Sequence, residues 1–300
     1  MSELSGVLLV DKPQGMTSHD VVGRVRKLYN TKRVGHTGTL DPLATGLLVV
    51  LVGRAAKAAE YLSLDNKRYL AGIRLGITSD TEDITGEILT RSDKVISEEE
   101  FFKTADSFVG EIMQTPPMYS ALKVDGVKLV DLARKNIVIE RESRPITIYS
   151  IDSGRLGENE YSMRVDCSKG TYIRTLCADI GKKLGCGAVM SSLVRERSGS
   201  FLLEDAYTLE ELENMDASER AGALIPTESL FYELDIVKLP EFYERLCRNG
   251  AEIYQKKIKT NYDIGTRLRI YGKDGFFALG EVMEFDEGSA VKAIKLFDLA

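Results

Sequence analysis

Two short apolar runs near the N-terminus, Gly6–Val10 and Leu47–Val52, constrain the fold of this chain most tightly. Uninterrupted apolar runs of this length indicate buried strands. Both are far shorter than the roughly 18 residues that a helix needs to cross a bilayer. The chain is therefore expected to fold around buried strands and to have no membrane-spanning segment.

The remaining periodicity predicts a mixed α/β protein. Alternating apolar residues indicate a half-buried strand over 68–76, and a helix over 19–29 is expected to begin after an N-cap at Ser18. The residues that follow this helix, 31–46, are rich in Gly, Thr, Asp and Pro and predict an ordered loop. Further helices are predicted over 54–64, 98–108, 126–135, 173–185 and 208–215, and strands over 146–152 and 160–168. The order lacks the strict βαβ rhythm of a doubly wound sheet.

A change of character near residue 233 predicts a second domain. An acidic stretch ends there. Beyond it, the sequence predicts a short helix near 240–248 and then strands over 266–271, 276–284 and 290–296. Turn sequences rich in Gly and Asp separate these strands. We therefore expect two domains, 1–232 and 233–300, of which the second is small and mostly β.

The charge is segregated along the chain, although the net charge is −6. Residues 1–60 hold eight basic against five acidic side chains, and 161–200 hold seven against three. Residues 201–233 instead hold nine acidic side chains against one basic. This pattern fits a molecule with one basic and one acidic face, although uneven, solvated surfaces explain it equally well.

Cysteine and histidine usage argues against a metal centre. No two of the four cysteines are spaced Cys-x-x-Cys, and the two histidines, His19 and His36, lie far from them in the sequence. The first residues also lack the basic start and apolar run of a secretory signal. The cysteines are thus expected to be reduced thiols in a protein that stays in the cytoplasm.

Three clusters hold residues that can do chemistry. The densest is Arg33–Gly46, where Asp41 precedes a proline in a loop crowded with Gly and Thr; Asp-Pro is also a common turn opener. Lys12–Gly15 follows a strand, but the lysine precedes the glycine, which is the wrong order for a phosphate loop. Cys167–Thr175 places Lys169, Tyr172 and Arg174 at a helix start, which suits phosphate or carboxylate groups. A Ser–His–acid hydrolase is hard to assemble from these residues.

Read together, these clusters resemble the TruB family of tRNA pseudouridine synthases. The matching segments occur in the family's order, from residue 6 to about residue 200, namely Gly6–Gly15, Gly35–Gly46, Lys67–Tyr69, Pro117–Lys123, Arg144–Ile146 and Cys167–Arg174. The resemblance implies the pseudouridine synthase fold, with a mixed, largely antiparallel sheet flanked by helices. It also implies that 233–300 form a PUA-like RNA-binding domain.

The resemblance further implies an activity and a set of site residues. The activity is isomerisation of the T-loop uridine at tRNA position 55, after the base is flipped out of its loop, without a cofactor. Asp41 occupies the position of the catalytic nucleophile, Arg174 that of its partner, and Tyr69 that of the tyrosine that stacks on the base and moves the C5 proton. Substrate-binding positions are matched by His36, Tyr172 and Leu193, and Lys12 and Lys169 are candidate phosphate contacts.

Three readings of the function remain open at this point. The first is the synthase, expected to act on the T-arm of tRNA as a monomer. The second is a non-catalytic RNA-binding or tRNA-folding protein on the same scaffold. The third is a phosphate-loop NTPase, which the order of Lys12 and Gly15 disfavours. Whether Asp41 would attack the ribose C1′ or the uracil ring is not decided by the sequence.

Overall fold

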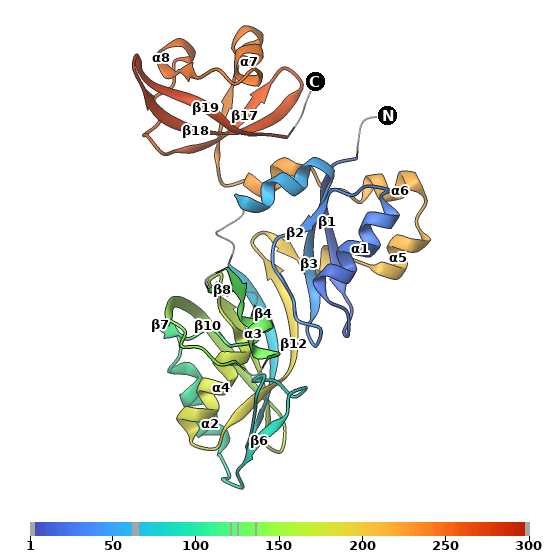
Figure 1. Ribbon diagram of the computed structural model, residues 1–300, viewed down its shortest axis with the longest axis vertical. Coiled ribbons are helices and arrows are strands. Elements are labelled where there is room, and N and C mark those ends of the chain that lie inside the picture. The colour runs from blue at the N-terminus through green and yellow to red at the C-terminus, as the bar shows by residue number, and fades with distance from the viewer. Residues whose placement is uncertain (1–3, 62–65, 121, 125, 136, 298–300) are drawn as a thin grey trace.

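The computed structural model describes residues 4–61, 66–120, 122–124, 126–135 and 137–297. Within them the chain builds one large sheet with helices packed against it and a smaller C-terminal sheet (Figure 1). The smaller sheet lies at the top of the view, beside the last residues of the large domain. No helix in the described part of the chain is long and apolar enough to cross a membrane.

The large sheet is mixed and largely antiparallel, as predicted. Among the described residues it has ten strands, of which β2 pairs only with β3 and β13 only with β12. Two of its pairings, β1 with β14 and β3 with β12, are parallel, and the rest are antiparallel. Its main path runs through β14 (Tyr207–Thr208), β1 (Gly6–Lys12), β3 (Thr45–Val52), β12 (Ala188–Ser198), β4 (Lys67–Leu75), β11 (Glu160–Cys167), β10 (Arg144–Gly157) and β7 (Gly110–Gln114), with β2 (Val34–His36) and β13 (Phe201–Leu202) added beside it.

The two apolar runs form β1 and β3, which pair with each other and are buried on both faces. Leu8 and Val10 belong to one core cluster, with residues of helix α1 (Ser18–Leu28). Val7 and Leu9 belong to another, on the opposite face. Because successive side chains of a strand point to opposite faces, burial on both sides requires an unbroken apolar run.

Helix α1 begins one residue earlier than predicted, because Thr17 and not Ser18 is its N-cap. The Thr17 hydroxyl accepts from the Asp20 amide at 3.1 Å, and the Asp20 carboxylate accepts from the Thr17 amide at 2.8 Å. This reciprocal capping box satisfies two amides that the first helical turn leaves free. The Ser18 side chain is buried instead and bonds to another segment, described below.

The other predicted helices are present, with shifted ends. The predicted helix over 54–64 is a 3₁₀ helix, η1 (Gly53–Glu60), and residues 62–64 of that prediction lie outside the described residues. The predicted helix over 126–135 is shorter, because Val127 and Lys128 form one strand of a small hairpin before α3 begins. The described helices are α2 (Glu98–Asp106), α3 (Leu129–Ala133), α4 (Ile173–Leu184), α5 (Leu209–Asn214) and α6 (Ala217–Gly222), with 3₁₀ turns η2 (Leu203–Asp205) and η3 (Thr227–Phe231).

Strand β12 was not predicted, although it lies between β3 and β4 in the sheet. Its sequence alternates poorly, because Ser191 and Ser192 lie next to each other and the pairing with β4 shifts register there. Also absent from the prediction are β2 within the 31–46 loop, strand β7 and two small hairpins, β5 (Ile77–Ser79) with β6 (Ile88–Arg91) and β8 (Lys123–Val124) with β9 (Val127–Lys128).

The C-terminal residues form a separate sheet with its own core cluster, which confirms a C-terminal β domain. The predicted strands over 266–271, 276–284 and 290–296 are all present. Phe231, Leu279 and Phe297 pack together with Ala58 of η1, where the two parts of the molecule meet. In order the sheet comprises β15 (Asp235–Lys238), β17 (Arg267–Gly272), β18 (Gly275–Phe285), β19 (Gly288–Leu296) and β16 (Ile253–Tyr254), with helices α7 (Glu241–Arg248) and α8 (Gln255–Ile258).

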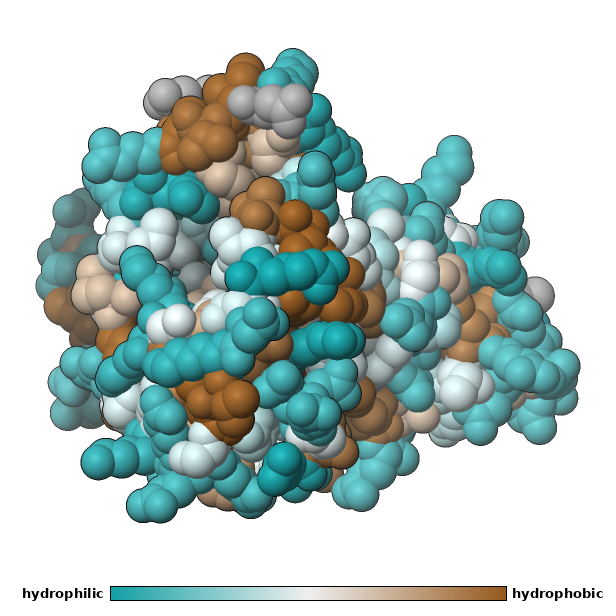
Figure 2. Space-filling view, turned by 90° about the horizontal axis from the view of Figure 1, so that it is seen from below, coloured by the Kyte–Doolittle hydropathy of each residue, from teal (hydrophilic) through white to brown (hydrophobic). Residues whose placement is uncertain are grey.

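The surface at the end opposite this domain is mostly hydrophilic. Seen from below, its hydrophobic patches are interrupted by hydrophilic side chains (Figure 2). Scattered exposed apolar residues such as Leu89 and Val95 are normal for a folded protein in water.

Close packing of α4 on the sheet gives a stability prediction. A Cβ at Gly181 would lie 2.1 Å from the Ala188 amide nitrogen, which belongs to the backbone and cannot rotate away. We expect Gly181→Ala to lower the free energy of unfolding by about 2–3 kcal/mol, measured by urea denaturation. Gly23→Ala in α1 is the control: nothing lies within 4 Å of that Cβ, so it should raise stability by about 0.5–1 kcal/mol. Equal effects of the two changes would contradict this view of the packing.

Candidate active site

Asp41 lies in the loop between β2 and β3, and this loop is held at several points. The Ser18 hydroxyl accepts from the Leu40 amide at 2.8 Å and lies 3.1 Å from the Leu40 carbonyl. The Gly15 amide donates to the Pro42 carbonyl at 2.7 Å. Leu40 itself is buried. The residues on both sides of Asp41 are thus tied to the start of α1 and the turn before it, which fixes where the carboxylate points.

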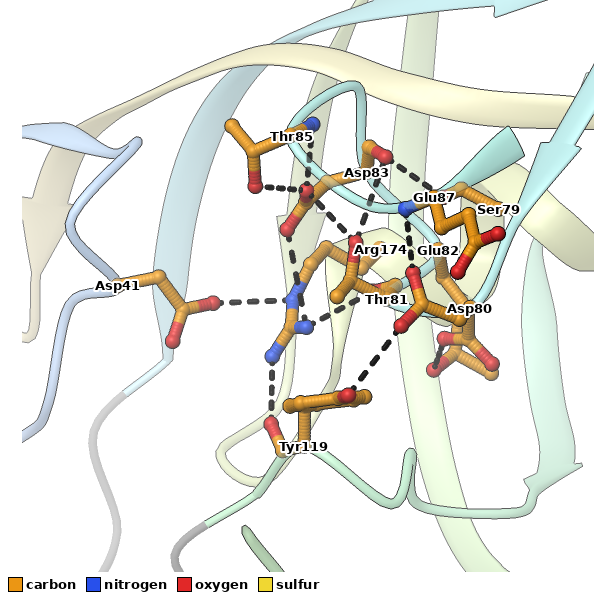
Figure 3. Close-up of polar contacts among 11 residues, drawn as sticks. Asp41, Ser79, Asp80, Thr81, Glu82, Asp83, Thr85, Glu87, Tyr119 and Arg174 are labelled. Atoms are coloured by element: carbon orange, nitrogen blue, oxygen red, sulfur yellow. Dashed lines mark hydrogen bonds and ion pairs between the residues drawn. The ribbon is translucent and has the colours of Figure 1, made fainter. Parts of the chain in front are cut away.

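Arg174 holds the Asp41 carboxylate directly. It lies in the first turn of α4, its side chain is 7% exposed, and its Nε lies 3.0 Å from Oδ2 of Asp41. Its other nitrogens donate to the carbonyls of Thr81 at 2.9 Å and Tyr119 at 2.8 Å (Figure 3). A guanidinium has a rigid planar fork of donors, so bonds in three directions fix its orientation. The Asp41 side chain is 39% exposed, and therefore remains open to a ligand on its other side.

Asp83 is a second carboxylate at this guanidinium, and sequence reasoning missed it. Its Oδ2 lies 3.8 Å from Nη1 of Arg174, and the side chain is 8% exposed. Its Oδ1 accepts from the hydroxyl of Thr81 at 2.9 Å and from the amide and hydroxyl of Thr85 at 2.9 and 2.6 Å. No candidate site residue was predicted in this segment. The alternation of Thr81, Asp83 and Thr85 before Gly86 was the available signal, because it is typical of a tight, side-chain-bonded turn.

The loop that carries Asp83 is anchored to β12. The Ile84 amide donates to the Met190 carbonyl and the Met190 amide to the Glu82 carbonyl. Glu82 has a φ of 63°, a conformation that is rare for a residue with a side chain. Its carboxylate accepts from the Thr175 hydroxyl at 2.6 Å, and burial raises its pKa. The loop that supports Arg174 is therefore itself held by the unpredicted strand and by α4.

Tyr69 lies on β4, in the same core cluster as Leu40, the residue before Asp41. It is 7% exposed, and burial raises the pKa of its phenol. Arg195 of β12 is its cross-strand partner and acts in the opposite direction on that pKa. Asp41 is close enough to act electrostatically on the same phenol. Asp41 is thus paired with Arg174 and lies within electrostatic range of the Tyr69 phenol.

The remaining predicted site residues differ from one another in burial and in hydrogen bonding. Tyr172 is the N-cap residue of α4, and the Gln114 side chain bonds both its amide and its carbonyl. Leu193 is buried in the cluster that contains Tyr69. His36 lies on β2 with its Nδ1 buried and without a hydrogen-bond partner among the described residues, and burial lowers its pKa. Lys169 is exposed, as a phosphate contact requires.

The structure corrects the expectation for Lys12. This side chain is completely buried, and its Nζ donates to the carbonyls of Pro13 at 2.9 Å and Met16 at 2.7 Å. Burial lowers its pKa, and the nearby Asp41 opposes that effect. Lys12 therefore supports the turn beside the Asp41 loop and is not available as a surface contact for phosphate.

The arrangement suits covalent chemistry by a carboxylate. Asp41 is partly exposed, oriented by a buried cation, and lies close to a buried phenol that can exchange a proton. No group of three or more His, Cys, Asp and Glu side chains in the described ranges is placed to hold a metal ion.

Substitution of Asp83 tests whether this carboxylate supports Arg174. Replacing it by alanine leaves Thr81, Thr85 and part of the Arg174 charge without their acceptor. We expect Asp83→Ala to lower the free energy of unfolding by about 3 kcal/mol, because one partner of a buried charge pair is removed. The exposed Asp93 is the matched control, and Asp93→Ala should change stability by less than about 0.5 kcal/mol. Urea denaturation measures both, and an equally small effect at position 83 would disprove a supporting role.

Comparisons with known proteins agree with this geometry. Residues 26–173 match the model of the TruB family pseudouridylate synthase N-terminal domain, and 174–232 match that of the tRNA pseudouridylate synthase B C-terminal domain. A tRNA pseudouridine synthase B of Clostridium tetani is 41% identical over 93% of this chain and 96% of its own length. One from Alkaliphilus oremlandii is 43% identical over 99% of this chain and 98% of its own.

Solved structures share the fold over almost the whole chain. The structure described as a Cbf5-Nop10-Gar1 complex contains a chain that superposes with a TM-score of 0.75 at 28% identity, covering 99% of this chain and 85% of that one. The corresponding chain of an H/ACA RNP bound to a substrate RNA containing 2′-deoxyuridine gives a TM-score of 0.71 at 26% identity, covering 98% and 85%. From the matched models and from relatives that align over nearly their full length, this chain belongs to the TruB family of pseudouridylate synthases.

Proposed function

We propose that this chain is a tRNA pseudouridine synthase that isomerises the T-loop uridine at position 55, with Asp41 as its nucleophile. One observation carries the proposal: a partly exposed carboxylate is held 3.0 Å from a buried guanidinium. A carboxylate that is oriented in this way and left open on one side is suited to act as a nucleophile. The names of the relatives, tRNA pseudouridine synthase B, support the same substrate class.

The proposed chemistry divides the isomerisation between these groups. The bond between N1 of uracil and C1′ breaks, the base turns, and a bond forms between C5 and C1′. Asp41 retains one fragment covalently during the turn, by attack either on C1′ or on the uracil ring. Arg174 favours the ionised form of Asp41 and directs it. Tyr69 stacks on the flipped base and takes the proton from C5, with Tyr172 and Leu193 lining the uracil pocket.

The proposal also assigns roles to the two domains and to the remaining site residues. Residues 1–232 form the catalytic domain, and 233–300 form a PUA-like RNA-binding domain; the separate sheet that begins at Asp235 supports this division. His36 contacts the RNA beside the vacated base, and Lys169 contacts phosphate. The enzyme acts as a monomer on the T-arm in the cytoplasm, and needs no cofactor.

The first test uses tRNA tritiated at C5 of its uridines. We expect wild type to release tritium and Asp41→Asn to be slower by at least about 10⁴-fold, because an amide cannot act as the nucleophile. Affinity for tRNA, measured by filter binding, should change little. If wild type binds tRNA but releases no tritium, the chain is an RNA-binding or tRNA-folding protein and the proposal fails.

A second test addresses the position within the tRNA. Replacing uridine 55 by cytidine in the labelled tRNA should abolish tritium release, because one uridine is flipped into one pocket. An isolated T-arm hairpin should remain a substrate. Release from the cytidine-55 tRNA at the wild-type level would show that the enzyme modifies another uridine.

A further inference from the structure

Arg195 is the most deeply buried arginine of the described residues, and the function proposed above assigns it no task. It is 2% exposed, and within the described part of the chain no carboxylate forms a salt bridge with it. Its Nε donates to the Leu47 carbonyl at 2.7 Å, and its Nη2 to the Gly38 carbonyl at 3.2 Å. Burying a charge without a counter-charge is costly, so an arginine at this position calls for a functional explanation.

Arg195 is a neighbour of Tyr69 in the large sheet. The two residues are opposite each other on the neighbouring strands β12 and β4. Directly opposed side chains have their Cβ atoms about 5 Å apart, within reach of an arginine and a tyrosine. The positive charge of Arg195 also lowers the pKa of the Tyr69 phenol, against the larger effect of burial. The two carbonyl bonds come from the Asp41 loop and from β3, so the same guanidinium ties the loop to the strand.

We propose that Arg195 is a positioning residue for Tyr69, holding the phenol oxygen in place and balancing the negative charge that this oxygen carries as a base. This role rests on the function proposed above. In the step concerned, the C5–H bond breaks, the proton passes to the phenolate oxygen, and the electron pair of the bond enters the ring, which takes up a proton at N1. Burial raises the pKa of this phenol, and a neighbouring fixed cation opposes that rise and so favours the phenolate that accepts the proton.

The other groups around this pair do not supply the same charge. Cys167 of β11 belongs to the same core cluster as Tyr69, and burial raises the pKa of its thiol to about 11, so it stays neutral. Asp41 faces it from the loop and opposes an anion. On the side of Arg195, Lys12 and His36 are neighbours, and both lose basicity through burial. Arg174 is matched by Asp41 and Asp83. Arg195 is the unmatched cation at the phenol among the described residues.

An optical titration tests the proposal without reference to turnover. The ultraviolet difference between wild type and Tyr69→Phe isolates Tyr69 from the other tyrosines of the chain. We expect Tyr69 to ionise at least about one pH unit higher in Arg195→Met than in wild type. Arg195→Lys keeps the charge and should restore most of the shift. Arg197→Met removes an arginine two residues along the same strand, and should leave the ionisation of Tyr69 unchanged.

Single-turnover tritium release supplies the second readout. We expect Arg195→Met to slow release about 10- to 100-fold, and to slow it less than about twofold further in a Tyr69→Phe background. The rising limb of the rate against pH should move upward with the optical titration. Equal slowing in both backgrounds, with no movement of either pH curve in folded protein, would overturn the proposal and leave Arg195 a purely structural tie.

Two further outcomes are distinguishable. If Arg195→Met does not fold, the proposal is tested by Arg195→Lys alone, because a shift of the Tyr69 ionisation in that variant larger than about one unit would contradict the role of charge. If wild type releases no tritium, the function proposed above fails, whereas the optical titration still decides whether Arg195 controls the phenol.

Discussion

The buried guanidinium of Arg174 is the interaction on which the site depends. A guanidinium out of water must find acceptors for its donors and a counter-charge, and Arg174 takes them from separate parts of the chain. Asp41 comes from the loop before β3, Thr81 and Asp83 from the turn after β5, and Tyr119 from the segment after β7. Since α4 carries the arginine itself, four segments meet at one side chain.

These four segments can be held at Arg174 only if the part of the sheet that carries them is rigid. Strands β1 and β3 supply this rigidity, because both of their faces are buried and their pairing is continuous over seven residue pairs. The Asp41 loop leaves one end of this pair and is tied back by Ser18, Gly15 and Arg195. The carboxylate is thus partly exposed while the backbone beneath it is fixed, which is what a nucleophile needs.

Charge in the site is arranged in two unequal groups. Arg174 is balanced by Asp41 and Asp83, whereas Arg195 and Lys12 are buried with carbonyl oxygens as their acceptors. Burial raises the pKa of the Tyr69 phenol, and Arg195 opposes that rise. A fixed cation is therefore already in place for an anion that forms there during a reaction. The net charge of −6 does not reveal this arrangement of charges, because it sums all charged side chains of the chain whatever their position.

The sequence by itself determined the mixed α/β class, the two buried strands and most helices, because periodicity is a local property of a chain. The candidates Asp41, Tyr69 and Arg174 came from the resemblance of short motifs to the TruB family. Strand β12 was not predicted from the sequence, since paired serines and a register shift remove the alternation that marks a strand. Only the tertiary structure decided that Thr17 caps α1, that Lys12 is buried, and that Asp83 and Arg195 support the site. Those roles come from contacts between residues distant in sequence, and whether a lysine or an aspartate is solvated or buried depends on what the rest of the chain packs against it.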